Sequence, residues 1–366
     1  MGQMMRALVL SDVGKIKTED VPKPVPGRGE VIVKVMACGI CGSDIPRAYR
    51  DGAHNMPLVI GHEFSGTVES VGEDADSSWT GKRVGVFPLI PCMKCKPCLD
   101  GMYEMCRNYD YLGSRRDGGF AEYVAVPQSN LIELPESVSF EAAAMLEPMA
   151  VAVHSMRRLL IMPDGAAPER ASNQKKIVVC GLGTIGTLLV MMLIDAGYND
   201  LLVIGNKEFQ RKTMLDLGIP ADCYCDSSKE DAHDFIMERT DGMGADAFFE
   251  CVGSNETVSL AVDSTGPDGS ICLVGNPHSD MTLDKNVYWK ILRNQITLNG
   301  TWNSSFAMKL GDRDDWKYVI DRIASGKIDP ERLITQRYPL EDIIKGFELM
   351  RDKSEDYIKV MYSRAE

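Results

Sequence analysis

A glycine-rich loop between a short apolar strand and a helix constrains this chain most. The apolar run from Ile177 to Cys180 precedes the sequence Gly181-Leu182-Gly183-Thr184-Ile185-Gly186, and an apolar helical pattern continues to Ala196. In this context a G-x-G-x-x-G motif lets backbone N–H groups at a helix N-terminus approach a pyrophosphate. Apolar strands and helical segments alternate after residue 175, which predicts a doubly wound parallel sheet. The expected dinucleotide-binding residues of the loop are Gly181, Gly183, Thr184, Ile185 and Gly186.

The segment that follows the next strand bears on the choice of cofactor. NAD-binding sites of this kind usually have an acidic residue about 20 residues after the glycine loop, where its carboxylate accepts hydrogen bonds from the adenosine ribose. This chain has Gly205, Asn206 and Lys207 there, with Arg211 close behind. Without a carboxylate, and with these donors, the segment predicts NADP, with NAD as the alternative and a solvated helix start as the other interpretation of Lys207. Val274 and Gly275, at the end of a later strand, are also assigned to the cofactor site.

Four cysteines lie close together between residues 92 and 106. Their spacing is Cys92-x2-Cys95-x2-Cys98-x7-Cys106, within an expected lobe at residues 88–110. Four thiolates predict a tetrahedral zinc site with no open position, which braces a loop. An iron–sulfur cluster is the alternative, but it needs a shorter last spacing and usually a proline after the last cysteine, where this chain has Arg107.

A second candidate metal site combines Cys41 with His62. Cys41 is followed by Ser43 and Asp44, and His62 by Glu63. A thiolate, an imidazole and a distant carboxylate would leave zinc an open position for an alcohol or carbonyl oxygen. The pattern alone is weak, because such a histidine is often an ordinary loop residue and such a cysteine a buried apolar side chain.

Composition excludes several classes of function. The chain has 366 residues, and a single hydrophobic core rarely extends over so many, so two domains are expected. Its first 150 or so residues have the pattern of short strands separated by turns. With 53 acidic and 40 basic residues the net charge is −13, so no nucleic-acid partner is expected. No apolar run reaches the roughly 18 residues of a membrane span. Eleven cysteines, an odd number, suit metal ligands in a reducing compartment, and we expect a cytoplasmic protein.

Together these motifs resemble the zinc-dependent medium-chain dehydrogenases. The shared marks are Gly61-His62-Glu63, the four-cysteine lobe, the run from Asp117 to Tyr123, Glu147-Pro148 and the glycine loop. The resemblance implies an α/β protein in which a GroES-like β-rich catalytic domain is interrupted by a Rossmann doubly wound parallel-sheet domain. The expected boundaries are 1–155 for the catalytic domain, 156–298 for the NAD(P)-binding domain and 299–366 for the return to the first.

The resemblance also implies the site. It makes Cys41, His62 and Glu147 the catalytic zinc ligands, with Glu63 as an alternate ligand or a neighbour of the metal. The substrate proton is expected to leave through Ser43 or water. With the cysteine lobe this implies two zinc ions per chain. The expected reaction is reversible oxidation of a secondary alcohol by hydride transfer to NAD(P).

Glu147 stands where the alcohol dehydrogenases of the family have a zinc-binding cysteine, and in this the chain resembles the polyol dehydrogenase branch. Within that branch the sequence most resembles the galactitol-1-phosphate 5-dehydrogenases. The substrate expected is a polyol or polyol phosphate, and the candidate substrate residues are Arg47, His54, Arg115 and Arg116. The absence of an acid at Gly205 departs from that group. L-Threonine, sorbitol and butanediol dehydrogenases remain alternatives, as does a different class, the zinc-independent quinone reductases and non-catalytic nucleotide-binding relatives. The family resemblance also implies a homodimer or homotetramer.

Overall fold

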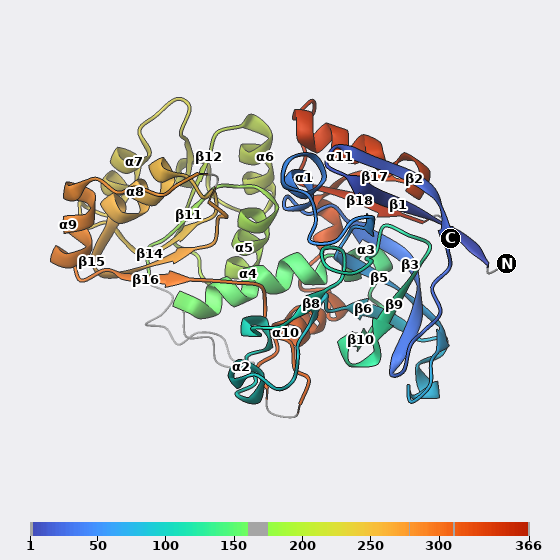
Figure 1. The fold of residues 1–366 in the computed structure, drawn as a ribbon. Helices are drawn as coiled ribbons and strands as arrows, with labels where there is room; N and C mark the ends of the chain where they lie inside the picture. Colours follow the sequence, from blue (N-terminus) through green and yellow to red (C-terminus); the bar gives the residue numbers. More distant parts are fainter. Residues whose placement is uncertain (1–2, 160–174, 278, 310–311, 365–366) are drawn as a thin grey trace. The chain divides into compact units, whose positions relative to one another are not determined.

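The computed structural model describes residues 3–159, 175–277, 279–309 and 312–364 (Figure 1). The chain forms two compact units, one of Met1–Ala150 with Ser304–Glu366 and one of Val151–Asn303. The sequence analysis expected domain boundaries after residues 155 and 298, and the two units divide after Ala150 and Asn303. Within the described residues, no helix is both long enough and apolar enough to cross a membrane.

The first unit is rich in β-structure, as predicted. Its larger sheet has the order β10-β6-β5-β3-β18-β17 with β9 also on β3, and a three-stranded sheet has the order β2-β1-β4. Alternating residues of β3, including Val31, Val33 and Val35, are fully buried in one core. The strands are β1 (Met4–Asp12), β2 (Lys15–Pro22), β3 (Glu30–Gly39), β4 (Leu58–Val59), β5 (Glu63–Val71), β6 (Arg83–Val86), β9 (Tyr123–Pro127), β10 (Leu131–Glu133), β17 (Ile334–Tyr338) and β18 (Lys359–Ser363).

Strand β18 returns the chain to this sheet, between β3 and the edge strand β17. It pairs antiparallel with β3, with Met361 opposite Gly39, and parallel with β17. A segment some three hundred residues downstream therefore lies beside the end of β3. Helices of the first unit are α1 (Asp44–Pro46), α2 (Lys96–Leu99), α3 (Phe140–Ala144), α10 (Asp315–Ala324) and α11 (Ile343–Asp352), while α4 (Leu146–Leu159) begins in it.

The second unit is the predicted parallel sheet. Its order is β13-β12-β11-β14-β15-β16, and every neighbouring pair is parallel. The order reverses beside β11, and open α/β sheets bind ligands at such a switch point. The elements are β11 (Ile177–Cys180), α5 (Thr184–Asp195), β12 (Leu201–Gly205), α6 (Glu208–Asp216), β13 (Tyr224–Asp226), α7 (Ala232–Arg239), β14 (Ala245–Glu250), α8 (Asn255–Ser264), β15 (Thr265–Leu273), α9 (Lys285–Arg293) and β16 (Thr297–Gly300).

Candidate active site

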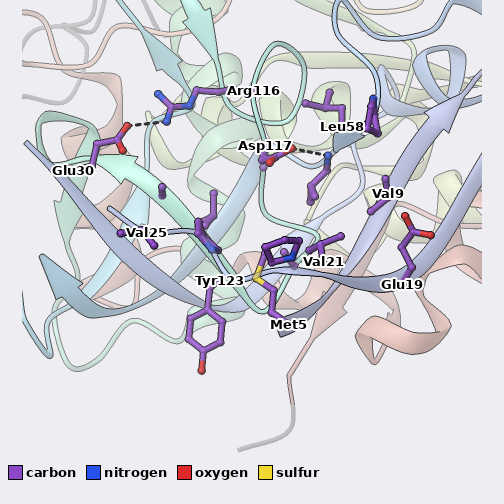
Figure 2. A pocket seen from close by; sticks show the side chains of 18 residues that line it. Met5, Val9, Glu19, Val21, Val25, Glu30, Leu58, Arg116, Asp117 and Tyr123 are labelled. Carbon is purple, nitrogen blue, oxygen red and sulfur yellow. Dashed lines mark hydrogen bonds and ion pairs between the residues drawn. The ribbon is translucent and has the colours of Figure 1, made fainter. Parts of the chain in front are cut away.

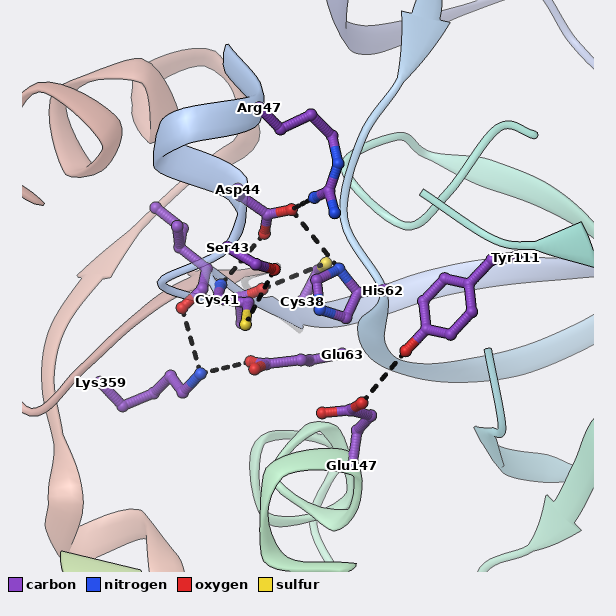
Figure 3. Close-up of polar contacts among 12 residues, drawn as sticks. Cys38, Cys41, Ser43, Asp44, Arg47, His62, Glu63, Tyr111, Glu147 and Lys359 are labelled. Atoms are coloured by element: carbon purple, nitrogen blue, oxygen red, sulfur yellow. Dashed lines mark hydrogen bonds and ion pairs between the residues drawn. The ribbon is translucent and has the colours of Figure 1, made fainter. Parts of the chain in front are cut away.

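Strand pairing brings the first metal-binding candidates together. Cys41 lies just beyond β3 and His62 just before β5, and these antiparallel strands end with Gly39 opposite Glu63. The ligand atoms of Cys41, His62 and Glu63 consequently lie within 4.8 Å of one another (Figure 3). His62 and Glu63 are almost fully buried. A thiolate, an imidazole and a carboxylate shielded from water form a donor set that suits Zn²⁺.

The turn before β5 requires glycine at position 61. Its φ of +101° lies in the region that favours glycine, and a Cβ there would sit 2.5 Å from the Phe120 ring and 2.9 Å from the Cys38 sulfur. The Gly118 position packs on the carbonyl oxygen of Gly61. Two sequence motifs, 61–63 and 117–123, are therefore in direct contact.

Asp44 orients the histidine. Its buried carboxylate lies 3.4 Å, Oδ1 to Nδ1, from His62, accepts a hydrogen bond from the Cys41 amide at 3.0 Å and pairs with Arg47. Because Nδ1 faces Asp44, Nε2 is the nitrogen left for a metal. Burial opposes the charged imidazole, but the charges of Asp44 and Cys41 raise the pKa of His62 well above its usual value in the metal-free chain. The guanidinium of Arg47 therefore forms an ion pair with the Asp44 carboxylate.

Glu147, the ligand favoured by the family resemblance, is held differently. It lies at the start of α4, and its Oε1 accepts a hydrogen bond from the Tyr111 hydroxyl at 3.3 Å (Figure 3). The Tyr111 ring contacts the His62 ring edge-on at 5.7 Å between centroids. Burial and repulsion by Glu63 raise the pKa of Glu147 to about 7. Among the described residues, Glu63 and not Glu147 completes the group within 4.8 Å, so direct ligation by Glu147 stays a prediction.

Ser43, the predicted proton acceptor, lies at the site, whereas His54, a candidate substrate residue, lies on the surface. The Ser43 hydroxyl contacts the Cys41 sulfur at 3.3 Å. His54 is exposed in the segment before β4. Ser43 thus contacts a residue of the candidate metal group, and the catalytic role of the serine stays a prediction.

The four-cysteine lobe forms a second donor group. The sulfurs of Cys92, Cys95, Cys98 and Cys106 lie within 4.8 Å of one another. The two short strands β7 (Leu89–Ile90) and β8 (Asp110–Tyr111) pair at its base, close to the expected limits 88–110. Backbone N–H groups of Arg107 and Cys98 lower the pKa of Cys95 to about 6, which favours a thiolate. The buried Tyr103 ties the lobe to Asp312 through a 2.9 Å hydrogen bond.

The glycine loop has the geometry expected of a dinucleotide site. Gly181 has a φ of +95°, and a Cβ there would lie 2.5 Å from Val252 in the loop after β14. Gly183 is the N-cap of α5 and has open space at its Cβ position, so its backbone is approachable. Thr184, Ile185 and the tightly packed Gly186 form the first turn of the helix.

The segment after β12 differs in part from expectation. A Cβ at Gly205 would lie 2.7 Å from both Gln210 Oε1 and the Tyr224 hydroxyl, so no acidic side chain fits there without displacing them. The Asn206 amide donates to Gln210 Oε1 at 3.1 Å, and Lys207 Nζ lies 5.4 Å from the centre of the Phe209 ring. Arg211, expected to supply charge to the cofactor, pairs with Glu208 on its own helix at 3.4 Å.

Val274 and Gly275 are held by Glu250 at the end of β14. Both amides donate to the Glu250 carbonyl, at 2.8 and 2.9 Å, and a Cβ at Gly275 would overlap the Gly253 amide nitrogen. The Glu250 side chain meanwhile accepts from the amides of Val252 and Gly253. Hydrogen bonds to Glu250 thus join the loops at the carboxyl ends of β14 and β15, and parallel sheets of this kind bind ligands at that edge.

The adjacent arginines 115 and 116 have separate environments. Arg116 pairs with Glu30 at 2.7 Å in an open cavity of about 450 Å³, whose lining includes none of Cys41, His62 and Glu63 (Figure 2). The Arg115 guanidinium lies 4.3 Å from the centre of the Tyr109 ring, which contacts Tyr111. Within the described part of the chain, its buried Nε has no hydrogen-bond partner. The structure does not bring Arg116 to the metal group, whereas Arg115 connects to it through two tyrosine rings.

Sequence reasoning missed Tyr111 and Lys359. Lys359 starts β18 and is 1% exposed, and its ammonium pairs with Glu63 and donates to the Ile40 carbonyl at 3.1 Å (Figure 3). A lysine within a predicted closing strand reads as an ordinary surface residue. The one available signal was its position in an otherwise apolar run.

Known dehydrogenases match nearly the whole of this chain. Residues 27–136 match the family described as alcohol dehydrogenase GroES-like domain, and residues 184–325 match zinc-binding dehydrogenase. The chain is 32% identical to galactitol 1-phosphate 5-dehydrogenase of Escherichia coli K12 over 93% of this chain and 95% of that protein. The solved structure of that enzyme has a TM-score of 0.88 at 30% identity, covering 98% of this chain and 100% of the other.

Two further relatives bear on substrate and cofactor. L-Threonine 3-dehydrogenase of Bacillus subtilis is 32% identical over 95% of each chain. A solved zinc-binding dehydrogenase from Sinorhizobium meliloti, described as bound to NADP, has a TM-score of 0.86 at 27% identity, covering 99% of this chain and 100% of the other. The predicted fold class, a GroES-like domain with a Rossmann sheet, is confirmed.

Proposed function

We propose that this chain, which belongs to the zinc-dependent medium-chain dehydrogenases, oxidises a secondary alcohol of a polyol or polyol phosphate to a ketone with NADP as hydride acceptor. The observation that carries the proposal is the buried group of Cys41, His62 and Glu63, with the histidine oriented by Asp44. Zinc bound there would act as a Lewis acid toward the substrate hydroxyl. The cysteine lobe would hold a second zinc ion with no open position.

The proton and the hydride leave the substrate by different routes. Ser43, beside Cys41, accepts the hydroxyl proton and passes it to water, and a bound nicotinamide would supply the hydride acceptor. Asp44 keeps His62 in one orientation throughout. A panel of polyols, polyol phosphates, L-threonine and vicinal diols, each with NAD and NADP, tests the proposal; preference for L-threonine would replace the polyol assignment.

Arg115 is proposed to bind a substrate phosphate. We expect Arg115→Met to raise KM for a polyol phosphate roughly tenfold or more, because a charge-assisted hydrogen bond contributes about 1.5–3 kcal/mol. Arg116→Met is the matched control, since Arg116 is already paired with Glu30. Steady-state kinetics with phosphorylated and unphosphorylated forms of one polyol make the comparison. Equal KM changes for both forms, or a larger change in Arg116→Met, would reject the assignment.

Lys207 is proposed to favour NADP over NAD. Replacing it by aspartate should lower the ratio of kcat/KM for NADP to that for NAD by about tenfold or more, because a carboxylate repels the 2′-phosphate. Lys212→Asp, at an exposed position of the same helix, is the control for net charge. The substitution is made at Lys207 alone because a side chain at Gly205 would displace Gln210 and Tyr224. An unchanged ratio in Lys207→Asp contradicts the NADP proposal.

A homodimer is proposed through the edge of the parallel sheet. In the described part of the chain β16 pairs only with β15, and exposed apolar residues lie on α9, on β16 and just after β16: Tyr288, Trp289, Leu292, Leu298 and Trp302. An open strand edge with an apolar surface is stabilised by pairing with a second copy. Leu298→Lys should yield monomers by light scattering, whereas Met243→Lys, an exposed position in a turn of the same unit, should not. A wild-type monomer would exclude the dimer, and a larger assembly would favour the tetramer.

A cytoplasmic location is part of the proposal, because a reducing compartment keeps the eleven thiols available as metal ligands or core residues.

Zinc content separates a zinc-dependent dehydrogenase from a zinc-independent quinone reductase or a non-catalytic nucleotide-binding relative. Two ions per chain support a dehydrogenase, whereas one supports a zinc-independent or non-catalytic relative.

A further inference from the structure

The side chain of Gln210 joins two loops of the second unit to which the cofactor is assigned. Its Oε1 accepts a hydrogen bond from the Asn206 amide at 3.1 Å, and its Nε2 donates one to the Leu182 carbonyl at 3.1 Å. Leu182 belongs to the glycine loop, whereas Asn206 belongs to the segment of residues 205–207 at the end of β12. One amide in the first turn of α6 therefore links the pyrophosphate loop to the segment expected at the adenosine ribose.

A carboxamide suits both of these contacts. The backbone N–H of Asn206 can only donate and the carbonyl of Leu182 can only accept, so the group between them needs an acceptor and a donor. A carboxylate in the same place would lose the contact with Leu182, and an apolar side chain would lose both contacts.

Gly205 leaves the space that the Gln210 amide occupies. A Cβ at Gly205 would lie 2.7 Å from Gln210 Oε1, which is closer than side chains pack. The φ of Gly205 is not positive, so the close approach and not backbone freedom explains the glycine. The Gly205 carbonyl accepts hydrogen bonds from the Ser227 amide at 2.8 Å and from the Ser227 hydroxyl at 3.1 Å. Ser227 and Gln210 together hold the backbone at the start of this segment.

We propose that Gln210 is a positioning residue that holds residues 205–207 against the glycine loop and so determines how the protein meets the 2′ position of the adenosine ribose. Asn206 and Lys207 are exposed, so the backbone that Gln210 anchors fixes where their side chains begin. This role rests on the proposed dinucleotide site and deepens the proposed preference for NADP.

Two fragments of the cofactor provide the test, because adenosine 2′,5′-bisphosphate and adenosine 5′-phosphate differ only in the 2′-phosphate. Their dissociation constants are measured with the full chain by isothermal titration calorimetry, independently of turnover. Gln210→Met keeps the length of the side chain and removes the amide. The dissociation constant of the bisphosphate should rise about tenfold, because two hydrogen bonds that order the segment are lost. That of the 5′-phosphate should change less than about threefold, since the glycine loop keeps its own backbone contacts.

Thr213→Val is the matched control for Gln210→Met. It removes a hydroxyl that donates to the Phe209 carbonyl at 2.9 Å within α6, so one hydrogen bond is lost without a change between the loops. The ratio of the two dissociation constants should keep its wild-type value in this variant. Gly205→Ala leaves Gln210 in place, but its methyl group displaces the amide oxygen, so the ratio should shift as in Gln210→Met. This variant keeps the role of Gln210 testable if Gln210→Met does not fold by circular dichroism.

The ratio of the two dissociation constants separates this role from the proposed function. An unchanged ratio in both Gln210→Met and Gly205→Ala overturns the positioning role, whichever cofactor the wild type prefers. A parallel rise of both constants also overturns it, because a merely structural residue would weaken both fragments alike. If the wild type prefers the 5′-phosphate and Gln210→Met still changes the ratio, NADP is rejected and the positioning role is upheld.

Discussion

Replacing Cys41 by alanine is expected to lower kcat/KM by on the order of 10³-fold, because a Lewis-acid metal contributes several kcal/mol to the transition state and each 1.36 kcal/mol corresponds to a factor of ten. The zinc content should fall by one ion per chain. The thermal unfolding temperature should change little, since Cys41 lies in a half-buried loop beyond β3.

Cys38→Ala is the matched control for this substitution. Cys38 lies three residues earlier, is fully buried, and contacts the Gly39 carbonyl through its sulfur. Its loss creates a small cavity and costs stability, but it should leave zinc content and kcat unchanged. A full zinc complement and normal turnover in Cys41→Ala would remove this residue from the site.

The second large effect is expected from Cys95→Ala in the cysteine lobe. Loss of a ligand to a structural metal, in a lobe with little core of its own, belongs with the most destabilising single substitutions, above about 4 kcal/mol. The lobe has a small core of its own, formed by Cys98, Tyr103 and Cys106, so its ordering depends strongly on the ion. We expect one zinc ion fewer, a lower unfolding temperature and rapid proteolysis within residues 88–110.

Turnover per folded molecule should change far less in this variant, because a metal with four protein ligands has no position for substrate. Cys223→Ala, a half-buried cysteine in the second unit, controls for the loss of a thiol. If Cys95→Ala abolished turnover while zinc content and stability were normal, the lobe would have to take part in the reaction.

Local patterns were sufficient for much of the fold. The first 150 or so residues form short strands as predicted, the apolar run from Ile177 to Cys180 corresponds to β11, and the helical pattern after the glycine loop corresponds to α5. Such elements are encoded over a few residues, by apolar periodicity and by turn residues. The same is true of the cysteine lobe, whose four ligands lie within 15 consecutive residues.

The candidate active site was predictable only in part. The sequence placed Cys41 and His62 in one group, and the family resemblance implied Glu147 as a ligand with Glu63 as an alternate; the structure groups Glu63 with them, and ligation by Glu147 stays a prediction. It also treated Arg115 and Arg116 alike. Neighbouring residues in an irregular segment point in different directions, and their partners, Tyr109 and Glu30, are chosen by packing.

The sequence by itself determined which chemical groups this protein has: a glycine loop for a dinucleotide, four closely spaced thiols and a thiolate–imidazole–carboxylate set. These depend on residue type and short spacing. Only the tertiary structure decided how the carboxylates are held, with Glu63 on Lys359 and Glu147 on Tyr111. The register of β18 on β3 delivers the lysine to Glu63 across 296 positions of sequence, and no local pattern encodes a pairing over that separation.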